Sequence, residues 1–226
     1  MTVPDPSSAR QKPRVKIDGL RDSANALVAA DAGADFLGFV FVEDVRRQLR
    51  PDEGQWITEG YLGGRQGVPN GPQLVGLFRD QPVDWVRHVA ERCHLHIAQL
   101  CGDEDPSYAD ELIVPVIKQI RVREEETAAD LRARVKPWLD AGHMAVLDAY
   151  DPSTPGGTGK TFDWSAAEGV VERAGIFLAG GLNPENVSEA VQRLNPWGVD
   201  VSSGVETDGR KDPDKIRDFI DAAKAA

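Results

Sequence analysis

Eight short runs of apolar and β-branched residues recur along the chain, and most are separated by stretches with helical spacing. The helical spacing is clear at Ala24, Leu27 and Val28, just before Gly33. Strands that alternate with helices pair in parallel, and eight such units within 226 residues match an α/β fold, the single-domain (β/α)8 TIM barrel, better than an open flavodoxin-like sheet. The runs cover residues 15–18, 36–41, 74–78, 96–100, 114–120, 145–148, 176–179 and 199–202.

Two segments fall outside this alternation. Residues 1–13 are rich in Pro and Ser and have no period, so we expect a flexible N-terminal tail there and the barrel over residues 14–226. The stretch Gly60–Pro72 has turn-forming residues throughout and predicts a mobile insertion.

Composition excludes several classes of function. The 26 Lys and Arg against 37 Asp and Glu give a net charge of −11, which repels a nucleic-acid backbone. The two cysteines form neither a disulfide framework nor a zinc motif, and no stretch approaches the roughly 18 apolar residues of a membrane helix. We therefore expect a cytoplasmic protein that binds neither nucleic acid nor membrane, and no obligate protein partner is evident.

Two aspartates end predicted strands. In a (β/α)8 barrel the active site lies where the strands end, so Asp18 and Asp148 are expected to face each other across the mouth. Carboxyl groups in unlike surroundings can act as an acid and base pair, although an inward aspartate can equally be structural.

Glycines and serines follow the last two predicted strands. Loops at these positions of a barrel commonly bind phosphate through backbone amides, whereas the plain alternative is that the glycines only form tight turns. The pattern favours a phosphorylated small-molecule ligand. The expected phosphate-binding residues are Gly180, Gly181, Ser202, Ser203 and Gly204.

The segment Pro155–Thr161 ends in Gly-Lys-Thr, as a nucleotide P-loop does, but the first glycine of that motif would fall at Thr154. A loop that closes over a substrate is the better interpretation, with a plain surface turn as the alternative.

Two further pairs of residues are interpreted as structural. His94 and His96 share a strand face but begin their strand, at the end of the barrel away from the chemistry, so no metal is expected. Lys16 and Asp200, from the first and last strands, are expected to form a buried ion pair lower in the barrel.

The strand ends carry motifs that resemble the phosphoribosylanthranilate isomerase family of tryptophan biosynthesis, from about residue 14 to the C-terminus. The motifs are Val15–Leu20, Gly38–Phe41, Gln99–Glu104, Leu147–Ala149, Gly156–Trp164, Leu178–Val187 and Trp197–Glu206.

This resemblance implies an acid/base Amadori rearrangement that needs no cofactor and no metal. Asp148 matches the family's general acid, and Arg47 matches the arginine that faces the anthranilate carboxylate, a planar pairing suited to guanidinium. The other positions expected to contact the substrate are Gln99, Cys101, Gly156 and Gly157.

The chain departs from the family at two positions. Asp18 stands where the family has its catalytic general-base cysteine, and Cys101 stands where it commonly has a histidine. The related histidine-pathway isomerase and the bifunctional isomerase of both pathways use an aspartate at the first position, so a carboxylate base is expected here. Two alternatives stay open: a bifunctional isomerase that also accepts the histidine-pathway aminoimidazole substrate, and an inactive barrel that still binds phosphoribosyl ligands.

Overall fold

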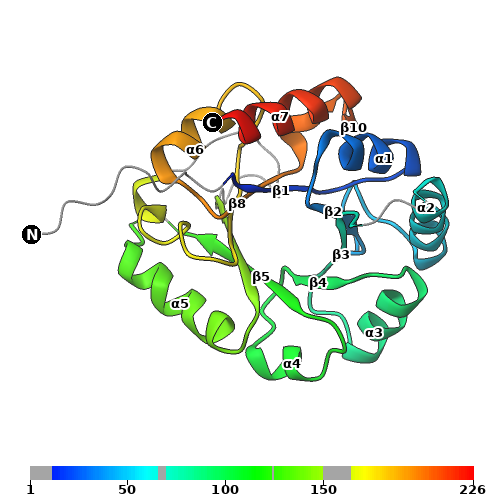
Figure 1. Cartoon of the computed structure of the whole chain (residues 1–226). Coiled ribbons are helices and arrows are strands. Elements are labelled where there is room, and N and C mark those ends of the chain that lie inside the picture. The colour runs from blue at the N-terminus through cyan, green and yellow to red at the C-terminus, as the bar shows by residue number, and fades with distance from the viewer. Residues whose placement is uncertain (1–11, 66–69, 124, 150–163) are drawn as a thin grey trace, which may run out of the picture.

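Eight parallel strands form a closed barrel in chain order, and the last strand pairs with the first (Figure 1). The computed structural model describes residues 12–65, 70–123, 125–149 and 164–226. The predicted barrel is therefore confirmed, and the open sheet is excluded. The strands are β1 (Arg14–Ile17), β2 (Phe36–Val40), β3 (Gln73–Phe78), β4 (Ile97–Leu100), β5 (Val116–Val122), β6 (Met144–Ala149), β7 (Ile176–Leu178) and β8 (Gly198–Val201).

Helices surround the barrel as an outer ring, and α7 lies between α6 and α1 (Figure 1). A short hairpin, β9 (Glu206–Thr207) and β10 (Arg210–Lys211), follows β8. In the described residues none of the helices has the length and apolarity needed to cross a membrane. The helices are α1 (Ser23–Ala32), α2 (Pro51–Gly64), α3 (Val83–Arg92), α4 (Pro106–Asp110), α5 (Ala128–Asp140), α6 (Val187–Leu194) and α7 (Pro213–Ala225), with 3-10 turns η1 (Trp164–Ala167) and η2 (Ser203–Val205).

Local sequence sets the ends of α1. The Asp22 side chain accepts a hydrogen bond from the backbone N of Asn25 at 2.7 Å, which satisfies one free amide of the first turn. Gly33 ends the helix with a φ of 100°, a left-handed conformation that favours glycine. These caps return the chain to β2 after a short turn.

The expected mobile insertion at Gly60–Pro72 is wrong for its first part, because α2 continues to Gly64. Ile57 and Tyr61 lie one helical turn apart and are both about 2% exposed, so their packing holds the helix together despite the glycines. Residues 66–69 lie outside the described residues.

Aromatic side chains fill the end of the barrel where the strands begin. Phe177 makes edge contacts with Phe36 and Trp197, each with ring centroids 5.1 Å apart. A Cβ on Gly198 would lie 2.6 Å from Phe177, so the glycine makes room for the ring. At this end His96 Nδ1 accepts a hydrogen bond from the backbone N of Leu74 at 2.9 Å, as a structural histidine does. The polar groups described below lie at the opposite end of the barrel, where the strands end.

Candidate active site

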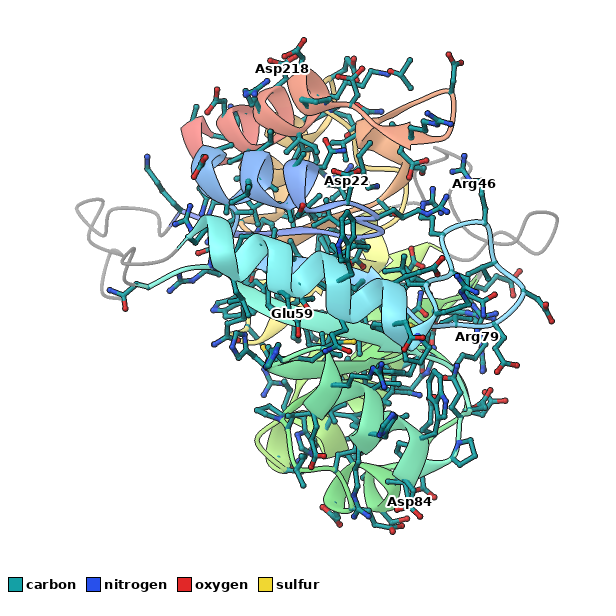
Figure 2. The ribbon with its side chains drawn as sticks, turned by 90° about the vertical axis from the view of Figure 1, so that its right-hand side faces the viewer. Asp22, Arg46, Glu59, Arg79, Asp84 and Asp218 are labelled. Carbon is teal, nitrogen blue, oxygen red and sulfur yellow. The ribbon has the colours of Figure 1, made fainter. Side chains whose placement is uncertain are left out.

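The carboxyl ends of the strands bring the predicted site residues to one end of the barrel. Asp18 follows β1, Asp148 lies at the end of β6, and Cys101 follows β4. Figure 2 shows Arg46 and Arg79, from the loops after β2 and β3, projecting at this same end. Gly156 and Gly157 lie outside the described residues.

Asp18 is a buried carboxyl group with a space made for it. It is 4% exposed, and its backbone N donates to Val201 O at 2.8 Å, which continues the pairing of β1 with β8. A Cβ on Gly38 of β2 would lie 1.9 Å from Asp18 Oδ1. Glycine at position 38 is therefore required for the Asp18 carboxyl group to occupy this place.

Lys16 joins Asp18 to Asp200. The predicted Lys16–Asp200 pair is confirmed, with Nζ 3.2 Å from Oδ2, but Lys16 Nζ also forms an ion pair with Asp18 Oδ1. The pair is thus part of the site and not separate from it. Burial lowers the pKa of Lys16, but the charges of Asp18 and Asp200 outweigh this and the net pKa is raised.

Asp200 has a strongly perturbed carboxyl group. Burial, then the nearby charge of Asp18, raise its pKa well above the ordinary value, against the opposing effect of Lys16. Asp148 also contributes to this rise, so its charge reaches the same interior. The carboxyl groups of Asp18, Asp148 and Asp200 therefore share one electrostatic environment.

Asp148 is partly buried and held by a neighbouring strand. Gln119 Nε2 on β5 donates a hydrogen bond to Asp148 Oδ2 at 2.6 Å. An amide donor helps to orient this carboxyl group, whereas Asp18 contacts an ammonium.

Gln99 and Cys101 lie together at the end of β4, and both are buried. Gln99 Nε2 is 3.7 Å from Cys101 Sγ, while Gln99 Oε1 is buried and has no hydrogen-bond partner among the described residues. Burial raises the pKa of the Cys101 thiol to about 12, so the thiol is neutral near pH 7. The site thus holds an acceptor oxygen and an uncharged thiol.

Arg47 is held by a carboxylate on the loop after β8. Its Nε lies 2.6 Å from Glu206 Oε1 and its Nη2 lies 3.0 Å from Glu206 Oε2, a bidentate geometry. Arg46 Nη2 is 2.5 Å from the same Oε2. The guanidinium of Arg47 therefore has a fixed position at the mouth.

Glu206 also pairs with a third cation, because Lys211 Nζ lies 3.0 Å from Glu206 Oε1. The same Lys211 Nζ donates a hydrogen bond to Ser202 O at 2.6 Å. Burial opposes ionisation of Glu206, but its hydrogen bond from Arg47 and the charge of Lys211 prevail and lower its pKa to about 2. Burial lowers the pKa of Lys211 to about 8. This network ties the loop after β2 to the loop after β8.

The loops after β7 and β8 meet, as a joint binding surface requires. Gly180 and Gly181 have φ of 91° and 69°, and a Cβ on Gly204 would lie 1.9 Å from Leu182 O. Asn186 Nδ2 donates to Gly181 O at 3.0 Å and fixes the first loop. Ser202 precedes η2, and Ser203 and Gly204 lie within it.

Sequence reasoning missed Gly38, Gln119, Glu206 and Lys211 as parts of the site. Glu206 ends one of the quoted motifs, and Gln119 faces inward two positions after Ile117 of the inner core, so a strand-period reading could have found both. Among the described residues there is no group of three or more His, Cys, Asp or Glu side chains that could hold a metal ion.

Comparison with known proteins accounts for this arrangement. The family model of N-(5'phosphoribosyl)anthranilate (PRA) isomerase matches residues 15–222. The chain belongs to this family. The N-(5'-phosphoribosyl)anthranilate isomerases of Geobacter metallireducens and Roseiflexus castenholzii are each 44% identical to it, over 94% of this chain and 99% and 98% of theirs.

Solved PRA isomerases share the fold. The enzyme of Thermotoga maritima has a TM-score of 0.80 and 34% identity, covering 95% of this chain and 100% of its own. A second, solved in complex with reduced 1-(o-carboxyphenylamino)-1-deoxyribulose 5-phosphate, has a TM-score of 0.76 and 31% identity over the same shares. These matches support the family expected from the motifs and favour neither the bifunctional nor the inactive alternative.

Proposed function

We propose that the protein converts N-(5'-phosphoribosyl)anthranilate into 1-(2-carboxyphenylamino)-1-deoxyribulose 5-phosphate, with Asp148 as general acid and Asp18 as general base. The observation that carries these roles is the presence of two carboxyl groups, in unlike surroundings, at the mouth of a PRA isomerase barrel. Membership of the family and the product analogue bound by one solved relative support the choice of substrate.

The reaction needs one proton delivered and one removed. Asp148 gives its proton to the ribose ring oxygen as the C1'–O bond breaks, which leaves a protonated Schiff base between C1' and the anthranilate nitrogen. Asp18 then takes the proton from C2', and the electron pair of that C–H bond neutralises the nitrogen to give an enolamine. The enolamine tautomerises to the ketone when the 2'-hydroxyl loses its proton and C1' gains one, so the sequence balances without any cofactor.

Binding groups surround these two residues. Arg47 receives the anthranilate carboxylate, and its pairing with Glu206 keeps the guanidinium extended and in place for that contact. Gln99 and Cys101 lie along the substrate, where the free Gln99 Oε1 accepts a hydrogen bond from a substrate donor. Substrate contact by Gly156 and Gly157 stays a prediction from the sequence, because both lie outside the described residues.

The phosphate sits against the backbone amides of the loops after β7 and β8. Gly180, Gly181, Ser202, Ser203 and Gly204 supply these amides, and the close approach of Gly204 to Leu182 brings the two loops together. A ligand-bound crystal structure tests this assignment directly. A phosphate located away from Gly181 and Gly204 would overturn it.

The activity is tested by the fluorescence loss of freshly prepared N-(5'-phosphoribosyl)anthranilate, run beside the histidine-pathway aminoimidazole substrate. We expect turnover of the first compound only. Turnover of both would establish the bifunctional enzyme, and binding of the reduced product analogue without turnover would establish an inactive barrel.

The setting follows from the same function. Both cysteines are free, which suits the reducing cytoplasm, and the net charge of −11 disfavours nucleic acid as a partner. We place the protein in the cytoplasm, acting on its substrate without an obligate protein partner.

A further inference from the structure

The interior of the barrel holds one ammonium group, of Lys16, and two carboxyl groups, of Asp18 and Asp200, with almost no exposure to water. Lys16 is 0% exposed, Asp18 4% and Asp200 6%. Two ionised carboxylates beside one ammonium would leave a net negative charge in this buried place, which is costly, so one carboxyl group holds a proton.

The geometry distinguishes the two carboxyl groups. Asp200 is the deeper one, because it pairs in register with Lys16, whereas Asp18 lies two residues further toward the mouth. Asp200 Oδ1 is buried and has no hydrogen-bond partner within the described part of the chain. An oxygen without donors is far less costly on a neutral acid than on a carboxylate.

We propose that Lys16 is a positioning residue for the reaction: its ammonium keeps the Asp18 carboxylate ionised and fixed at the barrel mouth, while Asp200 beneath it holds the proton. This inference rests on the proposed function for the role of Asp18 as base. Ionisation before the substrate arrives is what a base needs, and contact with one fixed cation limits where the carboxylate can point.

Titratable groups on other elements also act on the protonation of Asp18 and Asp200. When Asp148 on β6 is ionised, as it is after it gives up its proton, its charge adds to the tendency of Asp200 to stay protonated. Lys211 on β10 feels the charge of Asp18, and Cys101 after β4 is neutral.

Infrared difference spectroscopy of the whole protein at pH 7 tests the protonation without any need for turnover. We expect a carbonyl band of a protonated carboxylic acid, at the high frequency of a carbonyl oxygen that accepts no hydrogen bond, as at Asp200 Oδ1, and its disappearance in Asp200→Asn. Asp148→Asn identifies any band from the general acid. The band should also be lost in Asp18→Asn, because the remaining carboxyl group can then ionise beside Lys16. A band at the lower frequency of a carbonyl oxygen that accepts a hydrogen bond from Lys16, as Asp18 Oδ1 would, or no difference between the wild type and Asp200→Asn, would overturn the proposal.

Kinetics test the positioning role. In Lys16→Met the acid limb of kcat/KM should move upward by at least about one pH unit, because an opposite charge at contact distance has been removed. The kcat at pH 7 should fall about 10-fold or more, while the Kd of the reduced product analogue changes less than about 3-fold. Lys16→Arg keeps a cation and should restore much of the wild-type profile.

Lys118→Met is the matched control for the loss of a buried lysine. Lys118 pairs with Glu104 at 2.7 Å and lies over the ring of Trp138 on α5, on the helix side of the barrel wall. Its removal should lower thermal stability without moving the acid limb. An unmoved acid limb in folded Lys16→Met would refute the positioning role, and if that variant fails to fold, the infrared result decides. A wild type without turnover would contradict the proposed function while the infrared test still stands.

Discussion

The two carboxyl groups at the barrel mouth have different neighbours. Asp18 contacts the Lys16 ammonium, whereas Asp148 accepts a hydrogen bond from the amide of Gln119. Carboxyl groups in unlike surroundings can act as an acid and base pair, which supports the proposed roles of Asp148 as acid and Asp18 as base.

Replacement of the proposed acid tests this division. Asp148→Asn should lower kcat by at least about 10²-fold, because an amide cannot deliver the proton that opens the ribose ring. Binding of the reduced product analogue, measured by calorimetry, should stay within a few fold of the wild type. A fully active Asn variant would remove Asp148 from the mechanism.

The proposed base is tested by exchange for cysteine, the residue that the resemblance to the family leads us to expect at this position. Asp18→Cys should retain part of the activity, with the acid limb of kcat/KM displaced to higher pH, since a thiol with an ordinary pKa of about 8.5 must first lose its proton. Asp18→Asn should abolish turnover and keep analogue binding. If Asp18→Cys gains activity over an inactive wild type, the carboxylate-base mechanism is wrong.

Arg47 is expected to act in binding and not in proton transfer. Arg47→Ala should raise KM with little change in kcat, at a loss of about 1.5–3 kcal/mol if a charged hydrogen bond to the substrate carboxylate is removed. Arg46→Ala is the matched control, because Arg46 also pairs with Glu206 but is more exposed. Equal losses in both variants would mean that support of Glu206, and not substrate contact, is the common role.

Single residues show how far the sequence predicts the site. Strand period places Lys16, Asp18 and Asp200 on the inward face, and barrel topology brings β1 beside β8, so the Lys16–Asp200 pair is predictable. The Lys16–Asp18 contact and the pairing of Arg47 with Glu206, 159 positions apart, depend on side-chain reach across loops. The periodicity of the sequence does not predict these side-chain contacts.

At the scale of elements, β2 makes room for the Asp18 carboxyl group because Gly38 has no side chain. Gly38→Ala should cost about 1–3 kcal/mol of stability, because the added methyl group overlaps the Asp18 carboxyl group. The displaced carboxyl group should lower kcat at least about 10-fold. Thermal unfolding and steady-state kinetics measure the two effects.

Gly63→Ala on α2 is the control for a glycine replacement. No atom lies within 4 Å of a Cβ at this position, so the change should leave kcat unaltered and stabilise the helix by about 0.5–1 kcal/mol. Similar kcat values for the wild type and Gly38→Ala would show that Asp18 does not need this space.

The elements themselves were predictable to different degrees. The strands begin and end within about two residues of the apolar runs, because both faces of a barrel strand are buried and the runs are nearly continuous. The end of α2 could not be predicted from the sequence, since Gly60, Gly63 and Gly64 are typical of a turn. The burial of Tyr61 stabilises the helix there instead. Tertiary packing here prevails over local propensity.

For the whole molecule, the Glu206 network predicts a loss of stability in acid. The pKa of Glu206 is lowered from 4.5 to about 2 in the folded state, so the ionised carboxylate stabilises the fold above about pH 4.5 and this stability is lost as the pH falls toward 2. Glu206→Gln should therefore show a flatter decline of the urea midpoint between these pH values. Glu91→Gln, at an exposed position of α3, should decline as the wild type does, and an equally steep decline in Glu206→Gln would exclude this linkage.

The burial of both thiols has a consequence for oxidative damage. Peroxide attacks the thiolate and not the thiol, and burial raises the pKa of Cys93 to about 11 and of Cys101 to about 12. At neutral pH on the order of one thiol in 10⁴ or fewer is ionised. The proposed base, the Asp18 carboxylate, is a group that peroxide cannot oxidise, so on this proposal the activity should outlast exposures that convert a cysteine base to the sulfinic acid.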